Sequence, residues 1–433
     1  MTAAADGDGA AAAAAVQAGV RSWLERHWDP ELSLVTWRRR LLDGGWAAPS
    51  WPVDWHGRGL PEWSDGVIAG ELAAVGAPGP PPGVGTGLAA PTLLTHGSDD
   101  LRRLLLGPIL TGEHHWCQLF SEPGAGSDLA GLTTRAERDG NEWVVTGQKV
   151  WSTSAHHADF GLLLARSDWD VPKHRGLTYF VLPMGQVGVE VRPLRQMNDH
   201  SSFNEVFLTE ARILAGHVVG EVGGGWSVAL TTLAFERRYG VAMSGRGTAS
   251  GIGRAAMEAE AEAAEHRRTY AWYPQRAGRP DLLVERAVAG SIAADPVVRQ
   301  HVAAVEALAR ANRWTAERAR AARTLDRAPG PEGSLGKLAT SVVARAAARA
   351  HSAIGGAAGL LTGADAARAG ASGAVAAEIL VSVPAQSIAG GTDEIQKTIV
   401  ADRVLGLPRE PQTDRELPFR AVAVPGPSPP PSG

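Results

Sequence analysis

The sequence contains a single cysteine, Cys117, among 433 residues. One thiol cannot form a disulfide within the chain, and it excludes a metal site built from several cysteines. This cysteine usage is typical of a reducing compartment, so we expect a cytoplasmic location. The pairs His114–His115 and His156–His157 have no partner ligands at metal-like spacing, and the sequence therefore predicts no zinc or iron site.

Long apolar runs and an excess of one charge are also missing. No apolar stretch reaches the roughly 18 to 20 residues that a membrane-spanning helix needs. The alanine-rich N-terminus carries Asp6 and Asp8 where a secretory signal would carry basic residues. The formal net charge is -4, with 20% charged residues. We therefore expect a soluble chain with no membrane span and no nucleic-acid partner.

The pattern along the chain predicts an α+β fold with the β module in the middle. Residues 16–115 form a helical pattern broken by Pro/Gly loops. Residues 116–222 contain short runs rich in Val, Tyr, Phe and Trp, which predict an antiparallel β domain. Residues 223–410 are again helical and rich in Ala and Arg. The proline-rich residues 411–433 predict a disordered tail.

The most specific stretch is FSEPGAGSDLAG, from Phe120 to Gly131. Gly124 and Gly126 allow backbone N–H groups to approach a ligand closely, and Ser121 and Ser127 supply hydroxyls. Such a loop suits the polar edge of a ring and a nearby pyrophosphate. The alternative is a β-turn made of ordinary turn-forming residues.

This stretch and four later motifs resemble the acyl-CoA dehydrogenase family, in its actinobacterial-type branch. The later motifs are GQKVWST, FNEVFL, VVGEVGGGW and GGTDEIQ…ADRVLGLP, and the resemblance runs from about Trp51 to Pro408. It implies an N-terminal helical domain, a central antiparallel β domain and a C-terminal four-helix bundle, with FAD between the last two. It also implies a dimer or tetramer, a place in lipid metabolism, and electron transfer to an electron-transfer flavoprotein or a similar acceptor.

The resemblance also assigns residues to the cofactor and the substrate. The FAD contacts that it implies are Gln118, Phe120, Ser121, Gly126, Ser127, Trp151, Thr153, Gly355, Gly356, Thr392, Glu394 and Gln396. Ser127 would also face an acyl-CoA or an acyl-carrier thioester. Three of these assignments have an alternative in ordinary packing. Trp151 fits a buried strand tryptophan, Gly355–Gly356 fits a packed helix turn, and Thr392 fits a helix N-cap with Ile395 and Ile399 as the buried face.

The catalytic base is missing from its usual place. Many relatives carry it in a Glu-Gly-Thr sequence near the C-terminus, where this chain has Gly390 ahead of Gly391. The stretch ALTTLAFERRYGVA offers Glu236, which borders a predicted apolar stripe through Leu230, Leu233 and Arg237. Partial burial there would raise the pKa of Glu236 and strengthen it as a base.

Glu236 matches the base of the branch that includes the isovaleryl-CoA enzyme, and Arg237 matches an arginine near the thioester. Gly390 would then leave room for a branched or bulky acyl group, and its N–H would help to hold the thioester oxygen. The alternative is a surface Glu236 that pairs with Arg237, Arg238 or solvent.

One departure from the family's pattern keeps a second function open. Relatives carry an Arg-x-x-Phe-Gly segment that contacts a neighbouring subunit's FAD, whereas LLVERAVAGSIAADPVVRQ retains Arg286 and Gln300 without the Phe-Gly. A non-catalytic or partner-dependent subunit of a heterotetramer is therefore a second hypothesis. An acyl-CoA oxidase that passes electrons to oxygen is a third. The basic loop VPKHRG, residues 171–176, suits either CoA phosphates or solvent.

Overall fold

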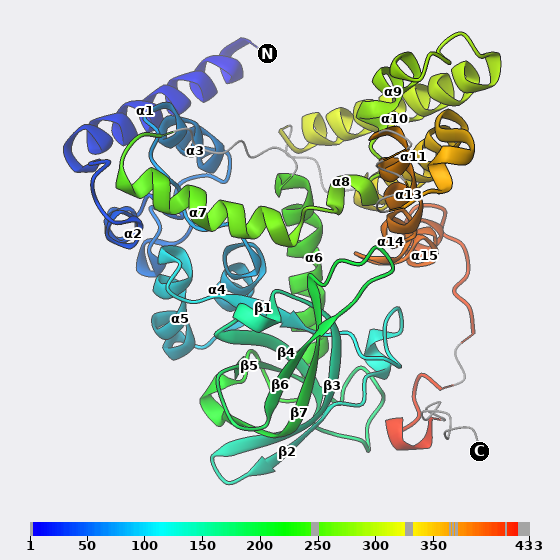
Figure 1. Cartoon of the computed structure of the whole chain (residues 1–433). Helices are drawn as coiled ribbons and strands as arrows, with labels where there is room; N and C mark the ends of the chain where they lie inside the picture. Colours follow the sequence, from blue (N-terminus) through cyan, green and yellow to red (C-terminus); the bar gives the residue numbers. More distant parts are fainter. Residues whose placement is uncertain are drawn as a thin grey trace. The chain divides into compact units, whose positions relative to one another are not determined.

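The computed structural model describes residues 3–243, 251–324, 332–362, 365, 368, 371–411 and 414–422. The chain divides into two compact units. Unit 1 comprises Met1–Leu194, Ser202–Thr269 and Asp414–Gly433, and unit 2 comprises Arg195–Ser201 and Tyr270–Thr413. Figure 1 labels the helices and strands of both units.

The first part of unit 1 is helical, as the sequence predicts. Its elements are α1 (Ala3–His27), α2 (Leu34–Asp43), η1 (Val53–Trp55), α3 (Ser64–Ala74), η2 (Gly85–Ala89), α4 (Ala90–His96) and α5 (Asp99–Thr111). Trp37 and Leu41 of α2 are fully buried in a core that they share with α1 and α3. The indole N–H of Trp37 donates to the Pro78 carbonyl at 2.7 Å, so this buried polar group is satisfied.

A seven-stranded sheet follows these helices. Its strands are β1 (Trp116–Leu119), β2 (Arg135–Asp139), β3 (Glu142–Thr153), β4 (Phe160–Arg166), β5 (Leu177–Pro183), β6 (Val189–Leu194) and β7 (Phe203–Leu214). The order is β1-β4-β2-β3-β7-β6, with β5 also paired to β4. The pairing is antiparallel except that β4 runs parallel to β1 and, at one residue pair, to β2. The predicted antiparallel β domain is confirmed in most of its strand pairs, and the parallel pairs of β4 are the exception.

Both faces of the sheet centre are buried. Along β4, Leu162 and Leu164 enter one core cluster while Leu163 and Ala165 enter another. This alternation follows from the two-residue period of a strand. The first cluster also contains residues of α4, α5 and α6 (Gly225–Met243), so these helices cover that face of the sheet (Figure 1).

Helices α6 and α7 (Arg254–Thr269) belong to unit 1, whereas the sequence pattern groups them with the C-terminal bundle. The side chain of Glu262 on α7 pairs with Arg38 of α2 at 2.7 Å. The carboxylate of Glu258 accepts a hydrogen bond from the Leu34 N–H at 2.7 Å. Helical pattern alone cannot show which core a helix joins, because that choice depends on contacts with residues far away in the sequence.

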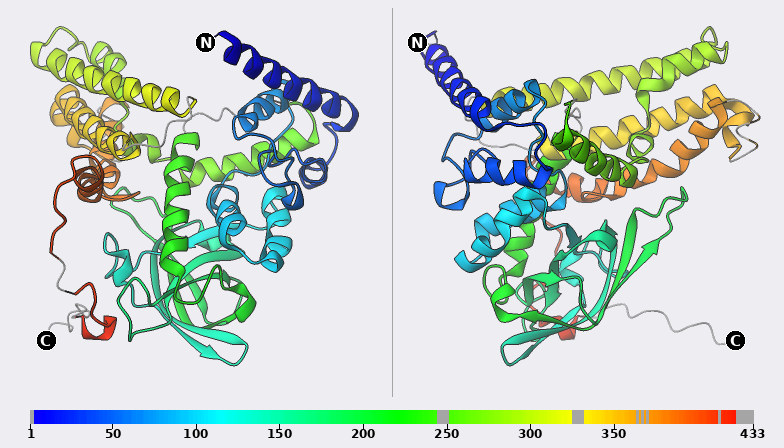
Figure 2. Two further views of the ribbon diagram at one scale, coloured as in Figure 1. Left: turned by 180° about the vertical axis from the view of Figure 1, so that it is seen from behind. Right: turned by 60° about the vertical axis from the view of Figure 1, so that its left-hand side comes forward.

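The described secondary-structure elements of unit 2 are helices, while its residues 195–201 form a turn. Its elements are α8 (Tyr273–Arg276), η6 (Pro280–Leu282), α9 (Leu283–Ala289), α10 (Pro296–Thr324), α11 (Glu332–Gly355), η7 (Gly356–Leu360), α13 (Ala371–Ser382), α14 (Pro384–Ile388) and α15 (Asp393–Arg403). Helices α10 and α11 lie side by side (Figure 2). Buried alanines such as Ala347 and Ala350 let the α11 backbone approach its neighbours closely.

Four short elements complete the described part of unit 1: η3 (Leu129–Gly131), η4 (Ala155–His157), η5 (Ala215–His217) and η8 (Phe419–Ala421). The prediction of a disordered tail at residues 411–433 is wrong for residues 414–422, which include η8 and pack on the β domain. The proline-rich composition of the tail does not indicate that one large apolar side chain, Phe419, is buried, with 1% of it exposed. Residues 423–433 lie outside the described part of the chain.

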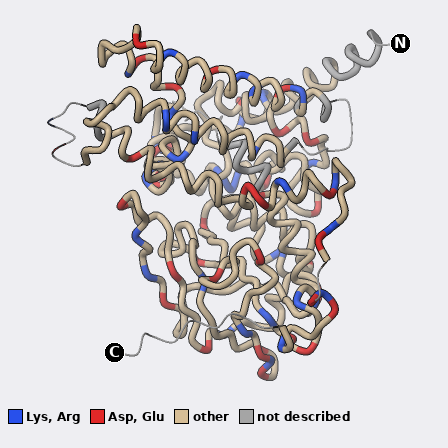
Figure 3. Tube along the Cα trace, turned by 90° about the vertical axis from the view of Figure 1, so that its right-hand side faces the viewer, with Lys and Arg blue, Asp and Glu red and all other residues tan. Residues whose placement is uncertain are grey.

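Acidic and basic residues are interspersed along the described trace (Figure 3). Among the described residues, no helix combines the length and apolarity needed to span a membrane. The described residues also contain no group of three or more His, Cys, Asp or Glu side chains that could hold a metal ion.

Candidate active site

Glu236 of α6 meets Gln118 of β1. The Gln118 Nε2 lies 3.4 Å from Glu236 Oε2, and the two residues are 118 positions apart in the sequence. This is a long hydrogen bond, so it is weak. Both side chains are half-buried. Because β1 runs directly into the glycine-containing loop at Phe120, the predicted base and the predicted cofactor loop lie in one region of unit 1.

A buried hydroxyl cluster positions α6. Thr232 Oγ1 lies 3.0 Å from Thr92 Oγ1 of α4 and 3.0 Å from the Tyr179 hydroxyl of β5. All three residues are fully buried. Glu236 follows Thr232 by four residues and therefore lies one turn further along the same side of the helix. The hydroxyl cluster thus fixes the helix that carries the carboxylate.

The predicted apolar stripe on α6 is correct at Leu233 and wrong at Leu230. Leu233 packs against the core, whereas Leu230 is 48% exposed. The buried face consists instead of Val228, Ala229 and Thr232, because these small side chains let the helix lie close to the sheet. The side chain of Arg237 lies outside the described residues.

A buried ion pair holds the glycine-containing loop in place. The Lys149 ammonium donates to Glu122 at 2.8 Å and to the carbonyls of Phe120 at 3.0 Å and Leu164 at 2.7 Å. These three bonds use all three of its protons. Glu122 also accepts hydrogen bonds from the Thr133 N–H at 2.7 Å and the Thr134 N–H at 2.9 Å. The two ends of the loop are thereby joined through one carboxylate.

The charges of this pair are set by burial and by each other. Burial raises the pKa of Glu122, but attraction to Lys149 and the hydrogen bonds outweigh it and lower that pKa to about 2. Burial lowers the pKa of Lys149, against the pull of Glu122. Sequence analysis missed both residues. The available signal was a lysine next to valine and tryptophan in a predicted strand, and an acid inside a turn motif.

The loop opens with a hydrogen-bonded turn between positions 122 and 125, as the β-turn alternative predicts, but neither steric contact nor backbone conformation requires its glycines. A Cβ added to Gly124 or Gly126 would meet nothing within 4 Å, and neither residue has a left-handed backbone. Both are exposed, as is Ser127, while Ser121 is half-buried. An open backbone with free space above it is what a flat ligand with polar edges requires. The loop therefore fits FAD.

Trp151 lies at a bulge in β3 and is 56% exposed. Its φ of 62° is left-handed, a conformation that costs a non-glycine residue on the order of 1 kcal/mol and is found at functional sites. The adjacent Val150 N–H donates to the Ser121 carbonyl at 2.9 Å, which ties the bulge to the glycine-containing loop. The interpretation of Trp151 as a buried strand tryptophan is wrong. Its exposed indole provides a flat surface beside that loop.

Asn204 of β7 stabilises the same bulge. Its side-chain amide donates to the Ser152 carbonyl at 2.9 Å, and it lies 3.2 Å from His156 Nδ1. Asn204 is 1% exposed, so this amide is a structural link inside the FNEVFL motif that sequence analysis missed. The half-buried Thr153 ends β3 opposite Phe203.

The ring of Phe120 points into the core. It contacts the ring of Tyr179 edge-to-face at a centroid distance of 5.7 Å and is 4% exposed. Its backbone is therefore the part that remains for a cofactor contact.

The predicted site residues of unit 2 surround the start of α15. Gly390 and Gly391 both have left-handed backbones, with φ of 69° and 84°, which favour glycine. Thr392 caps α15 by accepting the Ile395 N–H at 3.2 Å, as predicted. Gln396 is 2% exposed and donates to the Gly390 carbonyl at 3.3 Å.

The predicted buried face of α15 is wrong, because Ile395 and Ile399 are only half-buried. The buried residues include Asp393, which pairs with Arg345 at 2.8 Å and with Lys337 at 3.3 Å. Burial raises the pKa of Asp393, but the hydrogen bonds lower it to about 2. Glu394 is exposed.

The predicted glycine turn follows α11. Gly355 is the last residue of that helix, and Gly356, with a φ of 49°, begins η7. A Cβ at Gly356 would meet nothing within 4 Å. The left-handed backbone is sufficient to explain a glycine there.

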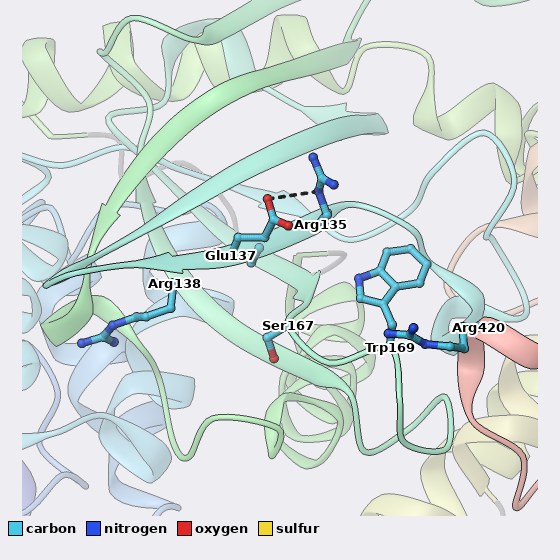
Figure 4. A pocket seen from close by; sticks show the side chains of 7 residues that line it. Arg135, Glu137, Arg138, Ser167, Trp169 and Arg420 are labelled. Atoms are coloured by element: carbon cyan, nitrogen blue, oxygen red, sulfur yellow. Dashed lines mark ion pairs between the residues drawn. The ribbon is translucent and has the colours of Figure 1, made fainter.

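A separate pocket of about 490 Å³ lies on the β domain (Figure 4). Its lining consists of Arg135, Ala136, Glu137, Arg138, Ser167, Trp169 and Arg420, and none of these is a predicted site residue. Arg135 is paired with Glu137 at 3.4 Å. The pocket is therefore not the predicted active site.

Comparison with known families identifies three consecutive domains. Residues 10–113 match the acyl-CoA dehydrogenase N-terminal domain, residues 117–210 the middle domain, and residues 281–405 the C-terminal domain. The matches leave out residues 211–280, which contain Glu236.

Curated relatives support the same assignment. The acyl-CoA dehydrogenase IpdE1 of Mycobacterium tuberculosis is 34% identical over 392 residues, which cover 86% of this chain and 88% of that protein. The acyl-CoA dehydrogenase FadE34 of the same organism is 48% identical over 211 residues, but these cover 49% of this chain and only 29% of FadE34. Among solved structures, the Tcur3481-Tcur3483 steroid ACAD matches with a TM-score of 0.62 at 25% identity, covering 92% of this chain and 98% of that one.

Proposed function

The chain belongs to the acyl-CoA dehydrogenase family, and from this premise we propose that it desaturates an acyl-CoA at the α,β position with FAD as cofactor. The contact between Glu236 and Gln118 carries the proposal. It brings a carboxylate to the beginning of a loop whose open glycines fit a flavin. The exposed Trp151, tied to that loop through Val150, adds the flat surface.

The reaction needs a base that takes the α-proton and an acceptor that takes a hydride from the β-carbon. Bound FAD would supply the acceptor and pass its electrons to an electron-transfer flavoprotein or a similar carrier. A carboxylate oxygen of Glu236 would take the α-proton. Hydrogen bonds to the thioester oxygen, one of them from the Gly390 N–H, would make that proton acidic enough to remove.

The acyl group that we propose is branched or bulky. Gly390 carries no side chain, and a Cβ there would meet nothing within 4 Å among the described residues. One structural relative is described as a steroid ACAD. A fused-ring acyl-CoA is therefore the first substrate class to test, ahead of straight chains.

The visible spectrum of the purified chain tests the function directly. The protein is titrated without oxygen with fused-ring, branched and straight-chain acyl-CoAs, each at the same concentration. We expect a yellow protein that is bleached fastest by a bulky acyl-CoA. Binding of FAD without bleaching by any member of the panel would contradict the proposed reaction.

A Gly126→Ala variant separates a cofactor role from a turn role. The added methyl group enters open space without a left-handed backbone, so the free energy of unfolding of the FAD-free protein should change by less than about 0.5 kcal/mol. The FAD dissociation constant should rise about tenfold or more, because the methyl would occupy the space of the ligand. Isothermal titration with FAD and denaturant unfolding measure the two quantities. Gly140→Ala, at a left-handed turn with a φ of 58°, is the contrasting control and should lower stability without altering FAD affinity.

Arg286 favours a second candidate, a chain that needs a partner subunit. In relatives, the Arg-x-x-Phe-Gly segment supplies an arginine to the FAD of a neighbouring subunit. Here Arg286 is 7% exposed and donates to the His351 ring inside unit 2. Burial lowers the pKa of His351 to about 4, so its neutral ring can accept that bond. Its other nitrogen lies 3.0 Å from the Arg279 carbonyl. We propose that a different chain completes the oligomer, and a colourless purified protein that gains FAD only on co-expression with a partner would support this candidate.

A further inference from the structure

Arg166 is a fully buried cation that is hydrogen-bonded to the segment following the glycine-containing loop. Its guanidinium donates to the carbonyls of Ala130 at 2.6 Å, Leu132 at 3.1 Å and Lys173 at 3.1 Å. Ala130 lies in η3 (Leu129–Gly131), which directly follows the SEPGAGSD motif. Arg166 thus fixes the far end of that loop.

Lys173 adds a second link between the same partners. It is the residue whose carbonyl Arg166 holds, and its ammonium lies 3.0 Å from the Asp128 carboxylate, at the end of the motif. Its side chain is 13% exposed. The basic loop at residues 171–176 is therefore a clamp on the cofactor loop at Lys173 rather than a freely solvated loop.

The cover over Arg166 comes from the C-terminus. We define residues 414–422 as the C-terminal clip. The ring of Phe419 stacks on the Arg166 guanidinium, 3.4 Å from the ring centroid, and lies 5.4 Å from the Trp169 ring. Phe419 is 1% exposed and Arg166 is fully buried.

The clip is also fixed through its backbone and by charge. The Phe419 N–H donates to the Val171 carbonyl at 2.9 Å, and the Arg420 N–H donates to the Trp169 carbonyl at 3.0 Å. Arg420 pairs with Asp170 at 2.5 Å. Burial lowers the pKa of Arg166 to about 10.

We propose that the C-terminal clip is a positioning element for the cofactor loop, and that Phe419 keeps Arg166 on the carbonyls of Ala130 and Leu132. A desolvated cation–π contact is among the stronger ones. Without the ring, water would reach the Arg166 guanidinium and compete for its hydrogen bonds. Release of these carbonyls would free residues 123–132, which lie between the two ends that Glu122 joins. The inference rests on the proposed flavin site for its consequence, but the effect on the loop does not require a cofactor.

The test compares four variants with the full chain. One chain ends at Pro411 and lacks the clip, one ends at Val422 and keeps it, and one carries Phe419→Ala. Leu417→Ala is the matched control, since Leu417 is in the clip but 45% exposed. We expect amide hydrogen exchange in residues 123–132 of the FAD-free protein to become about tenfold faster in the first chain and in Phe419→Ala. The FAD dissociation constant should rise by a similar factor, while the other two proteins should match the full chain.

The synthetic peptide DRELPFRAV, added to the chain that ends at Pro411, should restore slow exchange and FAD affinity. Unchanged exchange and affinity after removal of the clip would overturn the proposal. Faster exchange across the whole β domain that the peptide does not reverse would also overturn it, because the clip would then be a general structural support. If the full chain binds no FAD, the flavin assignment fails, and the exchange rates still decide the role of the clip.

Discussion

Replacing Glu236 with Gln is expected to lower the turnover number by about 100- to 10,000-fold while FAD stays bound. The amide has nearly the same shape as the carboxylate and can keep the contact with Gln118, which lies 3.4 Å away. It cannot accept the α-proton, so the loss should appear in the rate of flavin bleaching and much less in substrate affinity. Anaerobic stopped-flow measurement with the best acyl-CoA from the panel gives both values.

The control for this variant is Glu221→Gln. Glu221 is an exposed carboxylate just ahead of α6, so its loss changes the charge near the helix without touching Gln118. Its turnover should stay within about twofold of the natural protein. If Glu236→Gln bleaches at the natural rate, the base lies elsewhere and the proposed mechanism is wrong.

The second large effect is expected from Glu122→Gln. This change leaves the Lys149 ammonium fully buried and without its counter-charge, which typically costs about 3–5 kcal/mol of stability. The glycine-containing loop should lose its anchor at the same time, because Glu122 joins Thr133, Thr134 and Lys149. Denaturant unfolding at pH 7 measures the stability. The matched control is Glu190→Gln, which removes an exposed pair with Arg192 and should cost less than about 1 kcal/mol.

The dependence of stability on acidic pH shows whether Glu122 acts through its charge or through its shape. The pKa of Glu122 is lowered from 4.5 to about 2 in the folded protein, so its contribution to stability is complete above about pH 4.5. That contribution is lost as the pH falls from about 4.5 towards 2, at up to about 1.4 kcal/mol per pH unit. Glu122→Gln should lack this part of the acid dependence. An equal acid dependence in both proteins would contradict the assigned charge state.

The sequence predicts the order of secondary structure well because periodicity is a local property. Helices before residue 116, strands up to Leu214 and helices afterwards all appear where the pattern places them. The parallel pairing of β1 with β4 was missed because it depends on which distant strands meet. The clip was missed because one phenylalanine in a proline-rich tail carries little weight in composition.

The candidate site divides in the same way. Residues that we propose to act on cofactor or substrate, such as Ser127 and Glu236, were named by resemblance. Residues that hold the motif in place, such as Lys149 and Asn204, were not found, since each acts through a buried partner that no short motif contains. Trp151 shows a third case: its exposure follows from a bulge and a left-handed backbone, which the alternation of a strand does not predict.

The hydroxyl cluster of Thr92, Tyr179 and Thr232 has a consequence for how this chain folds. It links segments that are 140 and 53 residues apart, and contacts of such long range form slowly. A nascent chain that has left the ribosome only up to residue 222 contains the strands of the sheet. Its Tyr179 hydroxyl still lacks the partner on α6. The change from strands to helices near residue 222 is thus a boundary in the sequence pattern but not a boundary of cooperative folding. Fragments cut there should be aggregation-prone, whereas fragments that extend through α7 retain the whole of this core.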